Sequence, residues 1–310
     1  MKRLETFLRE QKQPEISIII GEIIKSGKEI YKQLQNIGIN GAYTESDEKN
    51  ASGDSPKKID IYAHDLLVEN LKSTNLVSII GSEESEELIK CGDFISNKVY
   101  DVYFDPLDGS SNLECSGGTG TIFGIFPSPC REMFGDDKEK KEEYKFPKGR
   151  DIVCSGYIYY SSSLILTITF GKGTFMFTFD GEHFVENIKS PLVFNDKCQK
   201  IYSVNEGSKD KWNDILREQI EVFKQEKYSL RYIGSMVADV HRTLLYGGVF
   251  IHPTKKLRLL YECIPISFLV ENCEGVAYAD ATKVLDLTPE SLHQKVPIVL
   301  GCQRDVYYFS

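Results

Sequence analysis

The feature that most constrains the fold is an apolar segment that runs directly into acidic residues. The β-forming run from Val99 to Phe104 is followed by Asp-Pro-Leu-Asp-Gly-Ser-Ser-Asn, which ends at Asn112. β-Branched and aromatic residues favour strands, and Pro and Gly end them. The sequence therefore predicts a strand that delivers two carboxylates, Asp105 and Asp108, and then a Gly-Ser-Ser turn.

The first part of the chain combines helical and strand patterns. Apolar residues recur at steps of three and four over 15–37, after Pro14, and again over 59–71, which predicts two amphipathic helices with Asp60 near the start of the second. Short β-rich runs at 76–80 and 99–104 come next. Three more runs, at 152–161, 164–170 and 173–179, are typical of a meander.

The pattern restarts near residue 195. Strands are predicted at 201–204, 249–252 and 298–301, and helices at 211–223, 236–245 and 261–273. We therefore expect two tightly packed domains, 1–194 and 195–310, because no long Pro- or Ser-rich linker separates them. The pattern by itself indicates a mixed α/β class.

Charge and composition exclude several classes of function. The net charge of −9 repels phosphate backbones and anionic lipid, so we expect neither nucleic acid nor membrane as a partner. No apolar run approaches the roughly 20 residues of a membrane span, and the first residues have no signal or transit pattern. We expect a cytoplasmic protein. The cysteines lack zinc-site spacing and do not form a dense disulfide framework, so we expect reduced thiols.

The two aspartates after the strand suit a cation. Asp105 and Asp108 are separated by a bend that Pro106 enforces, so both can face one ion, and the Leu107 carbonyl adds a third oxygen. Oxygen ligands of this kind favour Mg²⁺, with Mn²⁺ as the alternative.

Phosphate chemistry is indicated beside this cation. Successive amides of Gly109, Ser110 and Ser111 form an anion nest before a helix. Glu83 and Glu84 end another strand, so one can bind metal while the other activates water. Any one of these acids alone is explained as a helix cap or a loop residue; their combination predicts metal-assisted attack of water at phosphorus.

These strings, in this order, resemble the class I fructose-1,6-bisphosphatase family, which includes sedoheptulose-1,7-bisphosphatases. The resemblance covers residue 15 to the C-terminus and is carried by the segments 57–60, 82–84, 104–112, 120–124, 205–207, 231–243 and 256–262. It implies a layered α/β/α/β/α sandwich with the metal site where the two domains meet.

The resemblance also implies roles for individual residues. Two or more cations per subunit would be bound by Glu83, Glu84, Asp105, Asp108 and Glu262 with the Leu107 carbonyl, while Asp60 and Glu84 would hold and deprotonate water. The substrate would contact Asp108, Gly109, Ser110 and Ser111 at the C1 phosphate, Gly234, Ser235 and Met236 at the sugar, and Asn205, Tyr232 and Lys256 at the distal phosphate. Arg231 would reach the distal phosphate from a neighbouring subunit, which implies a homodimer or homotetramer.

The chain departs from the family pattern in two places. The family's AMP site falls on Gln13-Pro14-Glu15, Val99, Tyr100 and Pro127, where no side-chain cation remains for the nucleotide phosphate, so we expect no AMP inhibition. Ser208 and His252 replace aromatic residues at the distal end of the pocket. This change favours sedoheptulose 1,7-bisphosphate over fructose 1,6-bisphosphate as the expected substrate, and dual activity is the further alternative.

Two other interpretations stay open at this stage. An inositol-monophosphatase-like enzyme shares an acidic metal site but not the strings at 231–243 and 256–262. A non-catalytic sugar-phosphate sensor would keep the pocket and lose a carboxylate, and none is missing from the set above.

Overall fold

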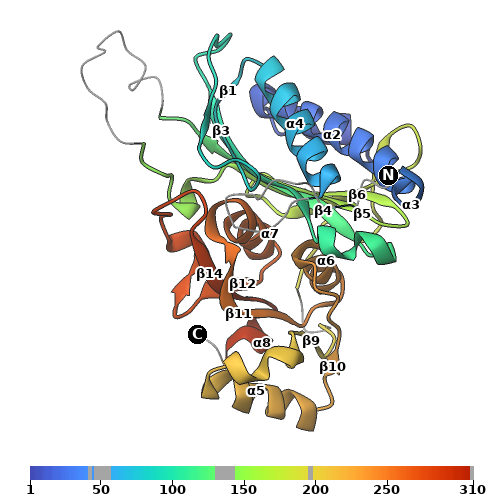
Figure 1. Ribbon diagram of the computed structural model, residues 1–310, viewed down its shortest axis with the longest axis vertical. Coiled ribbons are helices and arrows are strands. Elements are labelled where there is room, and N and C mark those ends of the chain that lie inside the picture. The colour runs from blue at the N-terminus through green and yellow to red at the C-terminus, as the bar shows by residue number, and fades with distance from the viewer. Residues whose placement is uncertain (41–43, 45–56, 130–143, 195–197, 308–310) are drawn as a thin grey trace.

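The protein is a sandwich of five layers, as a computed structural model shows (Figure 1). The structure describes residues 1–40, 44, 57–129, 144–194 and 198–307. The N-terminal helices cover the outer face of a first sheet, two helices lie between this sheet and a second one, and further helices cover the far side of the second sheet. The expected α/β/α/β/α layering is confirmed.

The outermost layer is formed by the N-terminal helices. Their bounds are α1 Leu4–Glu10, α2 Pro14–Gln35, α3 Ile37–Asn40 and α4 Lys58–Ser73. Pro14 occupies the first turn of α2, where its missing N–H costs nothing. The predicted apolar stripe of α2 is buried at Ile16, Ile19, Ile20, Ile23 and Ile30, and α2 packs on α4 and the first sheet.

The first sheet has eight strands in the order β2-β1-β3-β4-β5-β6-β7-β8. Only β1 and β3 pair in parallel; all other neighbours are antiparallel. The bounds are β1 Val77–Ser82, β2 Ile89–Lys90, β3 Tyr100–Asp108, β4 Thr119–Pro127, β5 Cys154–Tyr160, β6 Leu164–Thr169, β7 Thr174–Phe179 and β8 Phe184–Glu186. The carboxyl ends of the parallel pair β1 and β3 therefore lie side by side.

The second sheet has six strands in the order β10-β9-β11-β14-β12-β13. The bounds are β9 Ile201–Ser203, β10 Ser229–Leu230, β11 Val249–Arg258, β12 Val276–Ala279, β13 Thr282–Lys283 and β14 Lys295–Gly301. Its helices are α5 Asp214–Gln225, α6 Met236–Tyr246, α7 Ile264–Glu271 and α8 Gln303–Val306. Helix α6 contacts β4, β5 and β11, and α7 contacts β4, β5 and β12, so both form the central layer.

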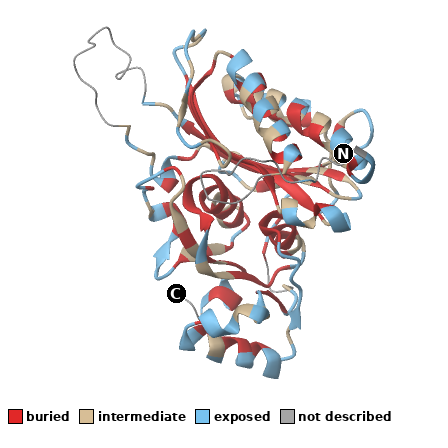
Figure 2. Cartoon of the chain, in the orientation of Figure 1, coloured by how far each residue is buried: buried red, intermediate tan, exposed pale blue. Residues whose placement is uncertain are grey.

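The layering follows from where apolar side chains are buried (Figure 2). One cluster joins α1, α2 and α4 to the outer face of the first sheet, and another joins its inner face to α6, α7 and the second sheet. A third, smaller cluster packs α5 against the second sheet around Phe223 and Trp212. No helix within the described ranges combines the length and the hydropathy that a bilayer crossing needs.

Two differences from the sequence prediction concern segments beside the cavity. The sequence analysis predicts no strand at 119–127, yet β4 is a central strand. It is buried on both faces and interrupted by Gly120 and Gly124, so polar and apolar residues do not alternate along it, although its Thr, Ile and Phe residues favour a strand. The helix expected at 261–273 begins as one π-helical turn, Leu259–Cys263, and becomes α-helical only from Ile264. That turn carries Glu262.

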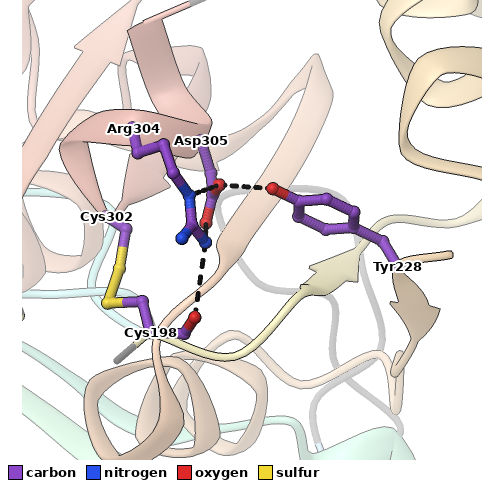
Figure 3. The surroundings of a disulfide bond; sticks show 5 residues. All are labelled: Cys198, Tyr228, Cys302, Arg304 and Asp305. Atoms are coloured by element: carbon purple, nitrogen blue, oxygen red, sulfur yellow. Dashed lines mark hydrogen bonds and ion pairs between the residues drawn. A yellow bond between two sulfur atoms is a disulfide. The ribbon is translucent and has the colours of Figure 1, made fainter. Parts of the chain in front are cut away.

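The expectation of reduced thiols throughout is wrong for one pair of cysteines. A disulfide joins Cys198 to Cys302 across 104 positions of sequence (Figure 3). No spacing motif signals this bond, because strand pairing brings the two ends together: Val249 of β11 is opposite Gly301 of β14, and β9 lies beside β11. Five other described cysteines are free.

Candidate active site

The candidate site is a cavity of about 410 Å³ where the two sheets meet. Its walls come from the ends of β1 and β3, the starts of α4 and α6, and strand β11 with the π-helical turn. The charged lining is dominated by acids, which are Asp60, Glu83, Glu84, Asp105, Asp108, Asp239 and Glu262, against the cations Lys57, Lys256 and Arg258. Most predicted site residues from both halves of the chain are therefore brought together.

Three carboxylates form the centre of this cavity. Asp105 and Asp108 come from the end of β3, and Glu262 comes from the π-helical turn after β11. Each offers an oxygen that lies within 4.8 Å of the others. Asp105 and Glu262 are 1% exposed and Asp108 is 8% exposed, so a cation held there would be largely removed from water.

The charges in this cluster repel one another. Burial raises the pKa of Asp105 well above its usual value, and the neighbouring charges of Glu262, Asp108 and Glu84 raise it further. Burial and Glu262 raise the pKa of Asp108 to about 7. Acids crowded in this way are stabilised in their charged form by a divalent cation. The donor set, which consists of carboxylate oxygens, fits Mg²⁺ or Mn²⁺.

The turn after β3 has the geometry of an anion nest. The Asp105 carboxylate accepts the Leu107 N–H at 2.9 Å, which fixes the bend at Pro106. Gly109 has a φ of +78°, and a Cβ at this position would lie 2.4 Å from the Ser235 hydroxyl oxygen, so only glycine fits. The 3-10 helix Ser110–Cys115 follows directly, and Gly109, Ser110 and Ser111 all line the cavity.

Asp60 is placed at the start of α4, as predicted. Its carboxylate accepts the Lys57 N–H at 2.7 Å, and its own N–H donates to the Lys57 carbonyl at 2.9 Å. Burial raises the pKa of Asp60 to about 6, although hydrogen bonds from Lys57 and Ser110 counteract part of the shift. A carboxyl group in this state can accept a proton near neutral pH.

Arg258 is a site residue that sequence analysis missed. Its guanidinium pairs with Glu83 from the end of β1 and, through Nε at 3.2 Å, with Glu262. The Arg258 N–H also donates to Glu262 at 2.5 Å. The side chain is 6% exposed. The sequence places Arg258 at the end of a strand but contains no signal for a partner 175 positions away.

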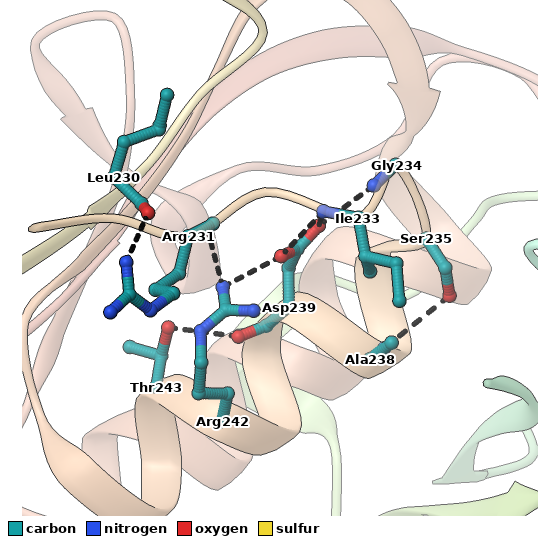
Figure 4. Close-up of polar contacts among 9 residues, drawn as sticks. All are labelled: Leu230, Arg231, Ile233, Gly234, Ser235, Ala238, Asp239, Arg242 and Thr243. Atoms are coloured by element: carbon teal, nitrogen blue, oxygen red, sulfur yellow. Dashed lines mark hydrogen bonds and ion pairs between the residues drawn. The ribbon is translucent and has the colours of Figure 1, made fainter. Parts of the chain in front are cut away.

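Asp239 is a second residue without a predicted role. It lies in the first turn of α6 with no exposed surface, and its carboxylate accepts the N–H groups of Ile233 and Gly234 at 3.1–3.2 Å (Figure 4). Arg242 donates to the same carboxylate at 2.6 Å. Asp239 therefore holds the segment that carries Tyr232, Gly234 and Ser235 into the cavity. An acid in the first turn of a predicted helix was the available signal.

The predicted distal residues separate into two groups. Tyr232 and Lys256 line the cavity together with His252. Asn205 does not; its side chain accepts the Gly207 N–H at 3.0 Å and caps a 3-10 helix. Arg231 is exposed, and its guanidinium donates to the Leu230 carbonyl at 2.8 Å (Figure 4). It does not line the cavity of its own subunit. The roles of Asn205 and Arg231 stay predictions.

The fold and the site define a class of protein, a sandwich of two mixed sheets and three helical layers with an acidic cavity between the sheets. Two family models match, the fructose-1-6-bisphosphatase N-terminal domain over residues 4–185 and the C-terminal domain over residues 196–310. The chain belongs to the fructose-1,6-bisphosphatase family, a family of phosphoric monoester hydrolases.

Individual relatives agree with this assignment. The chain is 38% identical to chloroplastic fructose-1,6-bisphosphatase 1 of Arabidopsis thaliana, over 94% of this chain and 75% of the relative. It is 37% identical to fructose-1,6-bisphosphatase isozyme 2 of Mus musculus, over 94% and 87%. The crystal structure of Leishmania major fructose-1,6-bisphosphatase in holo form superposes with a TM-score of 0.90 at 33% identity, covering 99% of this chain and 97% of that one.

Proposed function

We propose that this protein is a metal-dependent phosphatase that hydrolyses the C1 phosphate ester of a ketose bisphosphate, with fructose 1,6-bisphosphate as the first candidate substrate. The observation that carries the proposal is the juxtaposition of the Asp105, Asp108 and Glu262 carboxylates with the turn at Gly109. Carboxylates that suit a metal ion and a turn that suits an anion lie side by side there, and metal-assisted hydrolysis of a phosphate ester uses both kinds of group.

Glu83, Glu84, Asp105, Asp108 and Glu262, with the Leu107 carbonyl, would hold two or more Mg²⁺ ions. The chemistry that these residues would gain from bound ions is positive charge to offset the negative charge of the phosphate ester. Manganese would serve in their place.

The remaining roles belong to side chains and amides of the cavity. Asp60 and Glu84 would orient the attacking water and take its proton, for which the pKa of Asp60 near 6 is suited. The amides after Asp108 would hold the C1 phosphate. Ser235 and Met236, at the start of α6, would contact the sugar, and the dipole of that helix favours an anion at the same place.

Lys256 would supply the cation for the distal phosphate, with Tyr232 beside it. Arg231 would act from a neighbouring subunit, so we propose a homodimer or homotetramer. The cytoplasmic location also stays a prediction, since the names of the relatives include both chloroplastic and cytosolic enzymes.

Sedoheptulose 1,7-bisphosphate is the second candidate substrate. The departures from the family pattern at the distal end favour it, whereas the relatives reported above are named fructose-1,6-bisphosphatases, so fructose 1,6-bisphosphate comes first. The observation in favour of sedoheptulose is His252, which lines the cavity together with Lys256 and stands where the family pattern has an aromatic residue. A smaller side chain there leaves room for one more carbon.

The test is a comparison of kcat/KM for the two bisphosphates on the purified protein with Mg²⁺. A higher value for the fructose ester supports the first candidate, and a preference above about tenfold for the sedoheptulose ester, or about 1.4 kcal/mol, reverses the order. Absence of phosphate release from both esters would contradict the proposed activity and favour a non-catalytic sensor.

A further inference from the structure

His293 lies at the junction of the two halves of the site without lining the cavity. It belongs to the segment that leads into β14, is half-buried, and makes two hydrogen bonds of 2.8 Å. Its Nε2 contacts the backbone carbonyl of Ser85, next to Glu84 on the N-terminal half. Its Nδ1 contacts the hydroxyl of Tyr261, next to Glu262 on the C-terminal half. From the sequence alone, this histidine has no role.

The donor and acceptor atoms fix the direction of each hydrogen bond in this series of linked residues. A carbonyl oxygen only accepts, so the proton of the imidazole is on Nε2 and points to Ser85. In the neutral ring Nδ1 is then an acceptor, and the Tyr261 hydroxyl donates to it. The phenol oxygen is left to accept from Arg258 Nε, which lies 3.2 Å away. The donors run in one direction from Arg258 through Tyr261 and His293 to Ser85.

The neutral ring agrees with its surroundings. Burial lowers the pKa of His293, and the charges of Arg258 and Lys295 lower it further, although the contact with Ser85 counteracts part of the shift. A charged imidazole would donate from both nitrogens, and Nδ1 could then no longer accept the Tyr261 hydroxyl proton.

Two neighbouring contacts hold His293 in place. Leu292 packs on the backbone of Gly81 in β1, where an added Cβ would lie 2.8 Å from the leucine side chain. The carbonyl of Gln294 accepts the Leu259 N–H at 2.7 Å at the start of the π-helical turn. Residues 292–294 are thus packed against both segments that supply the acids of the site, with the imidazole between them.

We propose that His293 is a positioning residue for the metal site, and that through Ser85 and Tyr261 it fixes the Glu83–Glu84 turn relative to Arg258 and Glu262. The inference rests on the metal-dependent function proposed above. His293 touches neither the carboxylates nor the cavity, so its effect reaches the metal through the residues it holds. Partners that orient metal ligands commonly change affinity or activity by 10- to 100-fold when removed.

The first test is Mn²⁺ binding by isothermal titration calorimetry, which needs no turnover. We expect His293→Ala to raise the Kd for Mn²⁺ by about tenfold or more, with KM for the bisphosphate at saturating metal within about twofold. His293→Gln presents a carbonyl to Tyr261 and an N–H to Ser85 and should restore the Kd to within about threefold. The matched control is His183→Ala in the β7–β8 turn, which should bind as the wild type does. A folded His293→Ala protein with the wild-type Kd would overturn the inference.

Tyr261→Phe gives an independent test, because it removes only one oxygen and keeps the ring. It should raise the Mn²⁺ Kd as well, and the double variant with His293→Ala should lose no more than the larger single loss, since both act in one chain. A wild-type Kd in Tyr261→Phe, or losses that add, would contradict it. Absence of phosphate release by the wild type would count against the proposed function alone, whereas an unchanged Kd in an active enzyme would count against the inference alone.

Discussion

Asp108 at the end of β3 accepts hydrogen bonds from the Ser235 hydroxyl and the Val237 N–H, both at 2.8 Å. One carboxylate oxygen therefore ties the first sheet to the start of α6 in the central layer. Because β3 and α6 belong to different halves of the chain, the same residue supplies a proposed metal ligand and joins the two walls of the cavity.

The two roles of Asp108 can be separated with Asp108→Asn. The amide oxygen can accept both existing hydrogen bonds, so we expect the melting temperature to stay within a few degrees. The negative charge is lost, so kcat should fall by about a hundredfold or more, the scale for losing a group that acts on the reaction. Steady-state kinetics and calorimetry measure the two effects. Asp210→Asn, at an exposed position, is the control, and wild-type turnover in Asp108→Asn would show that the charge has no part in catalysis.

Gly109→Ala should damage both stability and phosphate binding. A positive φ costs an alanine about 1–2 kcal/mol, and the added Cβ would lie 2.4 Å from the Ser235 hydroxyl oxygen. We expect a total loss of about 2–4 kcal/mol in the free energy of unfolding and a raised KM. Gly21→Ala in α2, with no atom within 4 Å of the new Cβ, should be neutral or stabilising by up to about 1 kcal/mol. Equal stability of the two variants would contradict this account of the turn.

The sequence predicts those features of the molecule that depend on the spacing of residues close together in the chain. The burial stripe of α2, the acids at the end of β3 and Asp60 at the start of α4 all follow from local spacing. The π-helical turn does not, because nothing in its sequence separates it from an ordinary helix.

The sequence also does not predict contacts between segments that are far apart in the chain. Arg258 pairs with Glu83, and His293 reaches Ser85, only because the two sheets meet at the cavity. A central strand such as β4 has neither alternation nor a charged end to mark it. The resemblance to a family predicts the layering, whereas no local pattern predicts the contacts between the two halves.

Metal should change how stability depends on pH. Burial and neighbouring acids raise the pKa of Asp105 well above its usual value and that of Asp108 to about 7. In the metal-free protein the contribution of Asp108 to stability is therefore complete below about pH 4 and is lost as pH rises through about 7. We expect a loss on the order of 2–4 kcal/mol between pH 5 and pH 8 in EDTA. Mg²⁺ stabilises the ionised acids, so the rise in melting temperature that it causes should be larger at pH 8 than at pH 5.5.

Melting temperatures are compared with and without Mg²⁺ at each pH. Burial raises the pKa of Asp101 to about 6, but Asp101 lies outside the cavity. Its titration therefore affects both samples equally and does not contribute to the difference that Mg²⁺ causes. Asp108→Asn should reduce the Mg²⁺ effect. A Mg²⁺ effect that is larger at pH 5.5 would contradict the assignment of these acids as metal ligands.

The Cys198–Cys302 disulfide should contribute to stability without affecting catalysis. It closes a long loop around the second sheet, and Arg304, next to it, donates to Asp305 at 2.8 Å and to the Cys198 carbonyl at 3.4 Å (Figure 3). Closing a loop of about 100 residues stabilises by about 2–5 kcal/mol. Replacing both cysteines by serine should lower the free energy of unfolding by that amount, measured in urea, and leave kcat unchanged. Cys115→Ser, at an exposed free thiol, is the control. A reductant that leaves the wild-type melting temperature unchanged would show that the bond does not form.

AMP should not inhibit this enzyme. Tyr100 of β3 is opposite Pro127 of β4, and Val99 precedes Tyr100, so these three positions of the family's nucleotide site lie together and none carries a cation. Burial raises the pKa of Tyr100, and the nearby negative charge of Glu15 raises it further. A phosphate dianion would be repelled there. Activity titrated with AMP should therefore stay constant through the micromolar range, whereas the double variant Val99→Lys, Pro127→Arg should gain sensitivity because it provides two cations for the phosphate. A severalfold loss of wild-type activity in micromolar AMP would mean that the nucleotide is held by other residues.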